Sequence, residues 1–85
     1  MKFKDKFINK KLRFSLGVEL SSNELYLSIP VSNSLVDYEE YYKITLSQFE
    51  EFQKDDDLVS EFIKNCRNKL NDGLLIVTPG SNRGV

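Results

Sequence analysis

The stretch that organises this chain is residues 28–42, SIPVSNSLVDYEEYY, in which an apolar segment leads into a loop and then into carboxylates interleaved with tyrosines. Before the loop, apolar and polar residues alternate over residues 25–31, which is the period-two pattern of a strand with one buried face. After it, the alternation returns at about residues 41–45. The stretch therefore predicts two strands that are joined by a loop at residues 32–37.

Working outward toward the N-terminus, residues 12–20 show the same alternation and predict a strand. The turn-forming residues 21–23, SSN, then connect it to the next strand as a hairpin. Pro30 has no amide donor, so we expect it at a strand end or on a sheet edge. The lysine-rich residues 1–11 fit a helix and an extended arm equally well, and the sequence leaves their structure open.

Toward the C-terminus, two helices are predicted. Ser47 and Glu50 have the spacing of a capping box and mark the start of the first helix. Residues 55–57, three aspartates, suit the cap and first turn of a second helix. The second helix should bury one stripe of side chains and end at residues 71–73, NDG; the stripe consists of Val59, Phe62, Ile63, Cys66 and Leu70.

The continuous apolar run at residues 74–77, LLIV, predicts a last strand inside the sheet. The order of elements is then β-β-β-α-α-β. This order predicts an α+β fold, an antiparallel sheet of about four strands with two helices packed on one face. We expect a single domain over residues 1–85, with a basic arm at 1–11 and a flexible tail at 79–85.

Composition narrows the class of protein. The chain has 85 residues, no histidine and one cysteine, Cys66. A lone cysteine and the lack of a signal peptide or long apolar span favour a cytoplasmic protein that does not enter a membrane. The net charge of −1 hides an asymmetry, because residues 1–13 carry six basic groups and one acidic group. Opposite charges at different places on one surface affect the choice of partner more than the fold.

The same composition argues against several kinds of chemistry. Without histidine or a second cysteine, a zinc site is not expected, and Cys66 on a buried stripe is an ordinary core residue. A domain this small is not expected to enclose a pocket for a small-molecule substrate. We therefore predict a protein that is not an enzyme and has no cofactor and no metal.

The acidic and aromatic residues 36–42 are the main candidate for a binding surface. Tyrosines supply rigid contact area and carboxylates select a cationic partner. Edge-strand tyrosines with solvated acids that discourage aggregation are the structural alternative. Because an unpaired buried Glu40 would be costly, we expect regular pairing to begin only at about Tyr41. The basic arm gives a second alternative, a small nucleic-acid-binding or regulatory module.

Four blocks carry a resemblance to a known group: residues 14–17 (FSLG), 28–33 (SIPVSN), 36–42 (VDYEEYY) and 79–84 (PGSNRG). Together they resemble short bacterial proteins of toxin–immunity loci, of the contact-dependent growth inhibition kind. The resemblance implies an immunity protein that binds and neutralises a cognate toxin domain, such as a nuclease. The residues it suggests for partner binding are Asn33, Asp37, Tyr38, Glu39, Glu40, Tyr41, Asn82 and Arg83.

Overall fold

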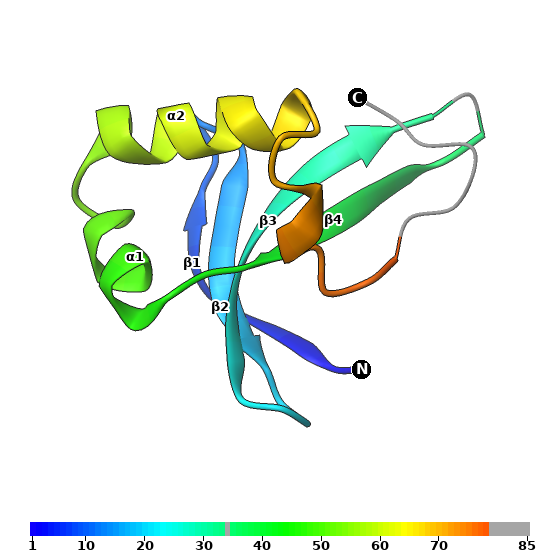
Figure 1. The fold of residues 1–85 in the computed structure, drawn as a ribbon, viewed down its shortest axis with the longest axis horizontal. Helices are drawn as coiled ribbons and strands as arrows, with labels where there is room; N and C mark the ends of the chain where they lie inside the picture. Colours follow the sequence, from blue (N-terminus) through cyan, green and yellow to red (C-terminus); the bar gives the residue numbers. More distant parts are fainter. Residues whose placement is uncertain (34, 79–85) are drawn as a thin grey trace.

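The computed structural model describes residues 1–33 and 35–78, which form an antiparallel sheet with helices on one side (Figure 1). The four strands lie in chain order, each antiparallel to the next: β1 (Phe3–Asn9), β2 (Phe14–Glu19), β3 (Glu24–Ser32) and β4 (Asp37–Lys43). Two helices and one short 3-10 turn follow: α1 (Leu46–Glu51), α2 (Asp56–Arg67) and η1 (Asp72–Leu74). The predicted α+β class is confirmed.

The fourth strand comes from the N-terminus and not from residues 74–77. The sequence leaves the structure of residues 1–11 open, and in the structure residues 3–9 of this segment form β1. A register shift between Asp5 and Phe7 marks a bulge in the strand. The extra residue of a bulge moves the following side chains to the other face. Phe3 and Phe7 therefore lie on opposite faces although their spacing of four resembles a helix, which is why the sequence pattern was ambiguous.

The prediction of a strand inside the sheet at residues 74–77 is wrong. The segment instead forms the end of η1 and a single bridge between Leu75 and Tyr42. The Ile76 amide donates to the Tyr41 carbonyl at 2.9 Å, so the segment lies along the edge of β4 that does not pair with β3. Leu74 and Val77 are exposed. An apolar run alone cannot distinguish a central strand from a segment that covers a strand edge.

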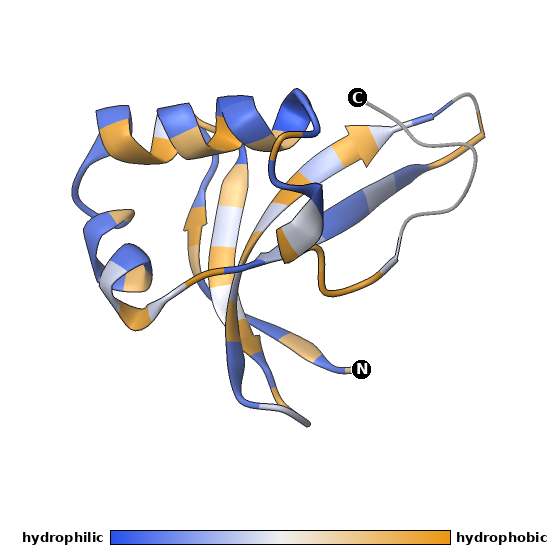
Figure 2. Cartoon of the chain, in the orientation of Figure 1, coloured by the Kyte–Doolittle hydropathy of each residue, from blue (hydrophilic) through white to orange (hydrophobic). Residues whose placement is uncertain are grey.

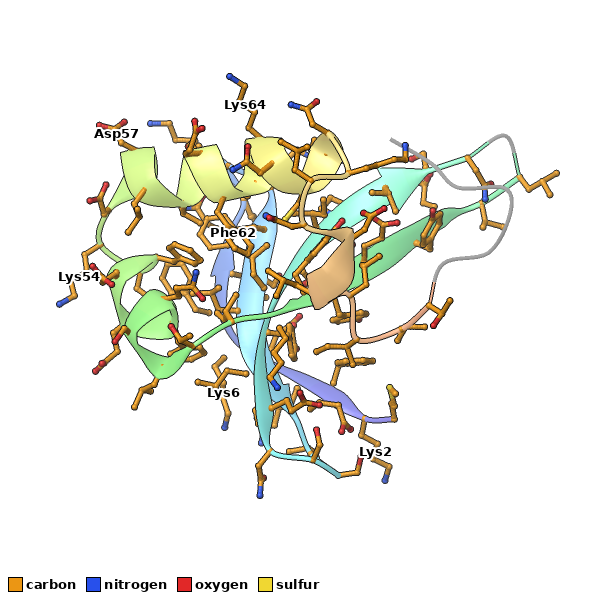
Figure 3. The ribbon with its side chains drawn as sticks, in the orientation of Figure 1. Lys2, Lys6, Lys54, Asp57, Phe62 and Lys64 are labelled. Carbon is orange, nitrogen blue, oxygen red and sulfur yellow. The ribbon has the colours of Figure 1, made fainter. Side chains whose placement is uncertain are left out.

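The core lies between the sheet and the helices. Figure 2 shows α2 with its hydrophobic side toward the strands and its hydrophilic side away from them. The Phe52 and Phe62 rings pack against each other with centroids 5.2 Å apart. Figure 3 shows Phe62 pointing to the inside of the molecule, whereas Lys54 and Lys64 point outward. The main buried residues of this core are Phe14, Leu16, Leu27, Ile29, Val31, Tyr42, Ile44, Phe52, Val59, Ile63 and Cys66.

Of the three helix ends predicted from the sequence, the start of α2 is confirmed, whereas the start of α1 and the end of α2 are wrong. Asp55 caps α2 by accepting the Leu58 amide at 3.0 Å, as predicted. The capping box of α1 is formed by Thr45 and Gln48, not by Ser47 and Glu50. Thr45 ends the apolar alternation of the strand, so its backbone is still extended where the helix begins.

The C-terminal end of α2 also differs. The helix ends at Arg67, before the predicted stop at residues 71–73. The residue in the left-handed region is Lys69, with φ 63°, and not Gly73. Leu70 is therefore 72% exposed and does not continue the buried stripe.

Pro30 lies where β3 has one neighbour. The pairing of β3 with β2 ends at Ser28, so beyond that point β3 is bonded only to β4. The Pro30 carbonyl accepts a hydrogen bond from Arg67 Nη2 at 3.2 Å. This placement confirms the expectation that a residue without an amide hydrogen lies on a local edge.

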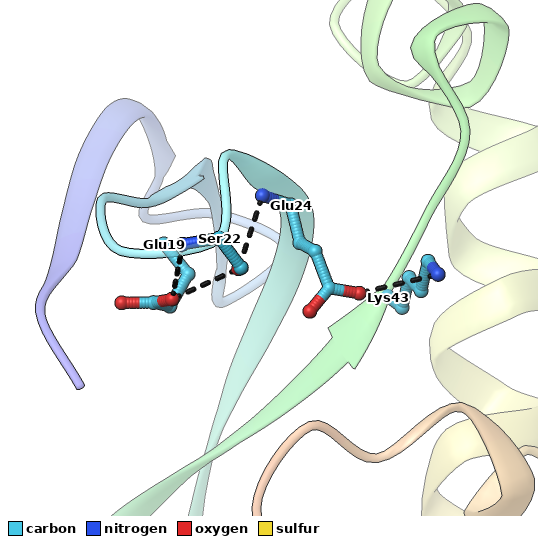
Figure 4. A network of polar contacts seen from close by, with 4 residues as sticks. All are labelled: Glu19, Ser22, Glu24 and Lys43. Carbon is cyan, nitrogen blue, oxygen red and sulfur yellow. Dashed lines mark hydrogen bonds and ion pairs between the residues drawn. The ribbon is translucent and has the colours of Figure 1, made fainter.

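Glu19 joins β1 to the turn between β2 and β3. Its carboxylate accepts the Lys2 amide at 2.9 Å, the Ser21 amide at 3.1 Å and hydroxyl Oγ of Ser21 at 2.6 Å. It also accepts the amide and the hydroxyl of Ser22, both at 2.9 Å (Figure 4). These hydrogen bonds, led by that of the Ser21 hydroxyl, lower the pKa of Glu19 to about 2. The charged form of Glu19 therefore stabilises the fold.

We expect Glu19→Gln to lower the thermal midpoint at pH 7, because a neutral amide accepts weaker hydrogen bonds than a carboxylate. The stabilisation is fully present above the ordinary glutamate pKa of 4.5 and is lost as the pH falls toward about 2. The difference in thermal midpoint between wild type and variant should therefore shrink as the pH falls through that interval, in melts followed by circular dichroism. Glu24→Gln, which removes only a partly exposed ion pair with Lys43 at 3.2 Å, is the control. A gap that stays constant down to pH 2 would contradict this role of Glu19.

Within residues 1–33 and 35–78, no helix is both long enough and apolar enough to span a bilayer.

Candidate functional site

The candidate site is the face of the sheet that points away from the helices, called here the outer face. Leu16, Leu27 and Tyr42 pair across β2, β3 and β4 and belong to the core, so they define the inner face. Side chains alternate along each strand, and the neighbouring rows therefore point outward. The outer rows are Phe3, Glu19 and Glu24; Asp5, Gly17, Tyr26 and Lys43; Ile8, Ser15, Ser28 and Tyr41; Pro30 and Glu39; and Ser32 and Asp37.

Three aromatic residues gather on this face and are called the ring cluster: Phe3, Tyr26 and Tyr41. Phe3 stacks on Tyr41 with centroids 3.7 Å apart and planes 11° from parallel. Tyr26 meets the edges of both rings, at 5.3 Å from Phe3 and 5.0 Å from Tyr41. Tyr26 is fully buried, and Tyr41 and Phe3 are half-buried. The cluster therefore joins β1, β3 and β4 on the face of the sheet opposite α1 and α2 (Figure 1).

Tyr26 reaches β1 by lying across Gly17 of β2. Its hydroxyl donates to Asp5 Oδ1 at 2.6 Å. A Cβ atom at Gly17 would lie 2.5 Å from the Tyr26 hydroxyl oxygen and would collide with the Lys4 carbonyl oxygen. Burial first, and then the bond to Asp5, raises the pKa of Tyr26. Glycine at position 17 is thus what allows the Tyr26–Asp5 contact.

Three of the carboxylates on the outer face are Asp5 and Glu39, beside the ring cluster, and Asp37, at the start of β4. Asp37 accepts the hydroxyl hydrogen of Ser32 at 2.6 Å and is exposed. In the part of the chain that the structure describes, none of the three forms an ion pair within 4.0 Å. All three residues are exposed.

The surroundings of Glu39 raise the pKa of its carboxyl group. Partial loss of hydration raises its pKa first, and the charge of Asp5 raises it further. Ser28, Arg13 and Arg67 act in the opposite direction. Loss of hydration and the negative charges of Glu39 and Asp5 also raise the pKa of Tyr41. Glu39 and Tyr41 therefore lie within electrostatic reach of each other and of Asp5.

Ser28 lies in the same region, in the row of Tyr41. It is 1% exposed, and its hydroxyl makes no hydrogen bond of good geometry within residues 1–33 and 35–78. It is nevertheless close enough to Glu39 to lower the pKa of that carboxyl group. A buried hydroxyl without a well-formed hydrogen bond is uncommon and needs an explanation.

The predicted partner-binding residues do not all share this face. Asp37, Glu39 and Tyr41 lie on the outer face. Regular pairing of β4 begins at Asp37, so the expectation that it begins at Tyr41 is wrong. Glu40 therefore lies on the inner face, where it is only 6% exposed and accepts a hydrogen bond from the Tyr42 hydroxyl at 2.8 Å. The neighbouring tyrosine hydroxyl makes this burial tolerable.

The remaining predicted residues lie elsewhere. Tyr38 is half-buried against the core. Asn33 shapes the turn between β3 and β4 by accepting the amides of Leu35 and Val36, both at 2.8 Å. Asn82 and Arg83 lie outside the described residues.

The sequence pattern did not identify three members of the site: Phe3, Asp5 and Ser28. Phe3 and Asp5 belong to the strand that the bulge concealed. Ser28 was readable only as the outward residue next to Tyr26 in an alternating strand. The outward alternation of Ser15, Gly17, Tyr26 and Ser28 would have been the available signal.

The groups on the outer face are aromatic rings, hydroxyls and carboxylates. Within the described part of the chain, no three histidine, cysteine, aspartate or glutamate side chains are placed to hold a metal ion. The face offers flat aromatic area and hydrogen-bond acceptors. Comparison of the chain with protein-family models, with curated proteins and with solved structures finds no match.

Proposed function

We propose that this chain is a non-enzymatic immunity or inhibitor protein that binds a cationic toxin domain through the outer face of its sheet. One observation carries the proposal: Asp5 and Glu39 lie beside the ring cluster, Asp37 lies further along the same face of β4, and none of the three has an ion pair among the described residues. Aromatic residues at the centre of an interface and charge at its rim are the usual anatomy of a specific protein contact.

The balance of charge on this face supports a cationic partner. Arg13 and Arg67 act on Glu39 from a distance, and Lys43 of the outer face is paired with Glu24. A local excess of negative charge speeds the approach of a positive partner, although the chain as a whole carries a net charge of only −1. The proposed place of action is the cytoplasm, where an immunity protein of this kind meets its toxin.

The test uses the product of the adjacent upstream gene as the candidate toxin. We expect the two proteins to co-purify, and we expect Asp37→Asn with Glu39→Gln to slow association by about tenfold at low salt. Glu50→Gln with Glu51→Gln removes two exposed carboxylates from α1 and is the matched control. Association rates measured by surface plasmon resonance over a salt series separate the two pairs.

Two results would count against this function. No binding of the neighbouring gene product would remove its main support, and equal rates for the two double variants would move the contact away from the outer face. Binding of single-stranded RNA that is lost when Lys2, Lys4 and Lys6 are replaced by alanine would instead favour the nucleic-acid alternative.

A further inference from the structure

We propose that the outer face contains a subsite for one guanidinium group, an arginine side chain of the partner, formed by Glu39, Ser28 and the ring of Tyr41. The inference rests on the proposed function, because it specifies which chemical group of a cationic partner is recognised. It also makes a claim that is tested without any partner protein.

The groups at the subsite accept hydrogen bonds. The Glu39 carboxylate has no ion pair in the part of the chain that the structure describes, and Asp5 adds a second carboxylate within electrostatic reach. An ionised carboxylate only accepts hydrogen bonds, whereas a guanidinium has five N–H donors in a planar fork. Arginine therefore matches a cluster of acceptors better than the single ammonium of lysine does.

Ser28 is the second, independent observation. Its hydroxyl is buried, lacks a well-formed hydrogen bond and lies on the outer face between Ser15 and Tyr41. Pro30 and Glu39 form the next outer row, so Ser28 is a diagonal neighbour of Glu39. An incoming N–H group would give this oxygen the hydrogen bond that it lacks.

The ring of Tyr41 gives the subsite a flat side. Tyr41 is half-buried and held in place by its stack on Phe3. A guanidinium plane packs well against an aromatic ring, and a ring that is already fixed loses little freedom when it binds. The ring cluster thus preorganises the place where the cation binds.

Two arginines of the chain itself lie near Glu39, and they bear on the affinity. Arg67 donates to the Pro30 carbonyl at 3.2 Å and is engaged there. Arg13 acts on Glu39 through its charge, without an ion pair in the described chain. The charge of Arg13 offsets part of the negative charge at Glu39, so Arg13→Gln should strengthen binding of an external guanidinium.

The test is a titration of the isotope-labelled full chain, followed by nuclear magnetic resonance. The probe is the capped tripeptide Gly-Arg-Gly, compared with the same peptide carrying lysine or the uncharged citrulline. We expect saturable shifts at Ser28, Glu39 and Tyr41 with the arginine peptide, affinity at least about threefold lower with lysine, and no saturation with citrulline.

Variants locate the subsite. Glu39→Gln should weaken binding of the arginine peptide by about tenfold and Ser28→Ala by about threefold. Ser28→Ala should at the same time leave the thermal midpoint unchanged or higher, because it removes a buried hydroxyl without a proper partner. Ser60→Ala and Glu50→Gln, both at exposed helix positions, are matched controls and should change neither quantity.

Equal affinities for the arginine and lysine peptides, absence of saturable shifts, or full binding by Glu39→Gln would overturn the subsite. Failure of the toxin to bind while the arginine peptide still does would reject the proposed function and leave the subsite standing. If Ser28→Ala and Glu39→Gln capture the toxin at wild-type affinity, the subsite would be rejected and the proposed function would stand.

Discussion

Replacing Gly17 with alanine is expected to lower the free energy of unfolding by about 2–3 kcal/mol, at the upper end of the cost of overpacking. The added Cβ would meet the Lys4 carbonyl oxygen and the phenol of Tyr26, at 2.5 Å from its hydroxyl oxygen. A backbone carbonyl in a paired strand cannot turn aside as a flexible side chain can. β1 must therefore move away from β2, which separates Asp5 from the Tyr26 hydroxyl.

Urea unfolding followed by circular dichroism measures this loss. Gly73→Ala is the matched control, because a Cβ there meets no atom within 4 Å, and its effect should be within about 0.5 kcal/mol. The loss should extend to the binding surface, since Phe3 of the ring cluster belongs to β1. A Gly17→Ala variant as stable as Gly73→Ala would show that Tyr26 does not need the space above Gly17.

Replacing Tyr42 with alanine is expected to have the largest effect, about 4 kcal/mol, which is a large part of the 5–15 kcal/mol typical of a small domain. Tyr42 is 0% exposed, and its ring belongs to the core. Its hydroxyl donates to the buried Glu40 carboxylate at 2.8 Å and lies 3.4 Å from the Cys66 carbonyl oxygen. The substitution therefore opens a cavity and takes a donor from a buried acid.

Tyr42→Phe separates the two contributions, because it keeps the ring and removes only the hydroxyl. We expect it to cost about 1–3 kcal/mol, the penalty for weakening the hydrogen bonding of a buried charged group. Tyr41→Phe is the control, since no hydrogen bond of the Tyr41 hydroxyl is present in the described chain, and it should cost less than about 0.5 kcal/mol. The same urea series reads all three variants, and equal costs for the two phenylalanine variants would contradict the role assigned to the Tyr42 hydroxyl.

The sheet and the helices could be predicted where one physical signal decided the outcome. Alternation at Leu25, Leu27 and Ile29 followed from a strand with one buried face, and Asp55 was readable as a helix cap. The position of Cys66 on the buried side of α2 followed from helical spacing. Each of these predictions depends on contacts within one element or on a single periodicity.

The missing parts depended on contacts between distant residues. β1 was ambiguous because its bulge broke the alternation between Phe3 and Phe7. The burial of Glu40 is a local exception, because the Tyr42 hydroxyl that makes it tolerable belongs to the same strand, two residues away. The site was half predictable because of contacts between distant residues. Tyr41 and Glu39 were found in one segment, whereas Asp5 and Phe3 join them only across the sheet.

The buried thiol of Cys66 provides an intrinsic reporter of opening of the molecule. The chain has no tryptophan for fluorescence, but it has this one cysteine, which is 1% exposed and whose burial raises its pKa to about 11. A disulfide-exchange reagent can then modify the folded protein only during excursions in which α2 leaves the sheet. Labelling rates in the absence of denaturant would thus measure how often those excursions occur, and a bound partner that tightens the sheet would slow them.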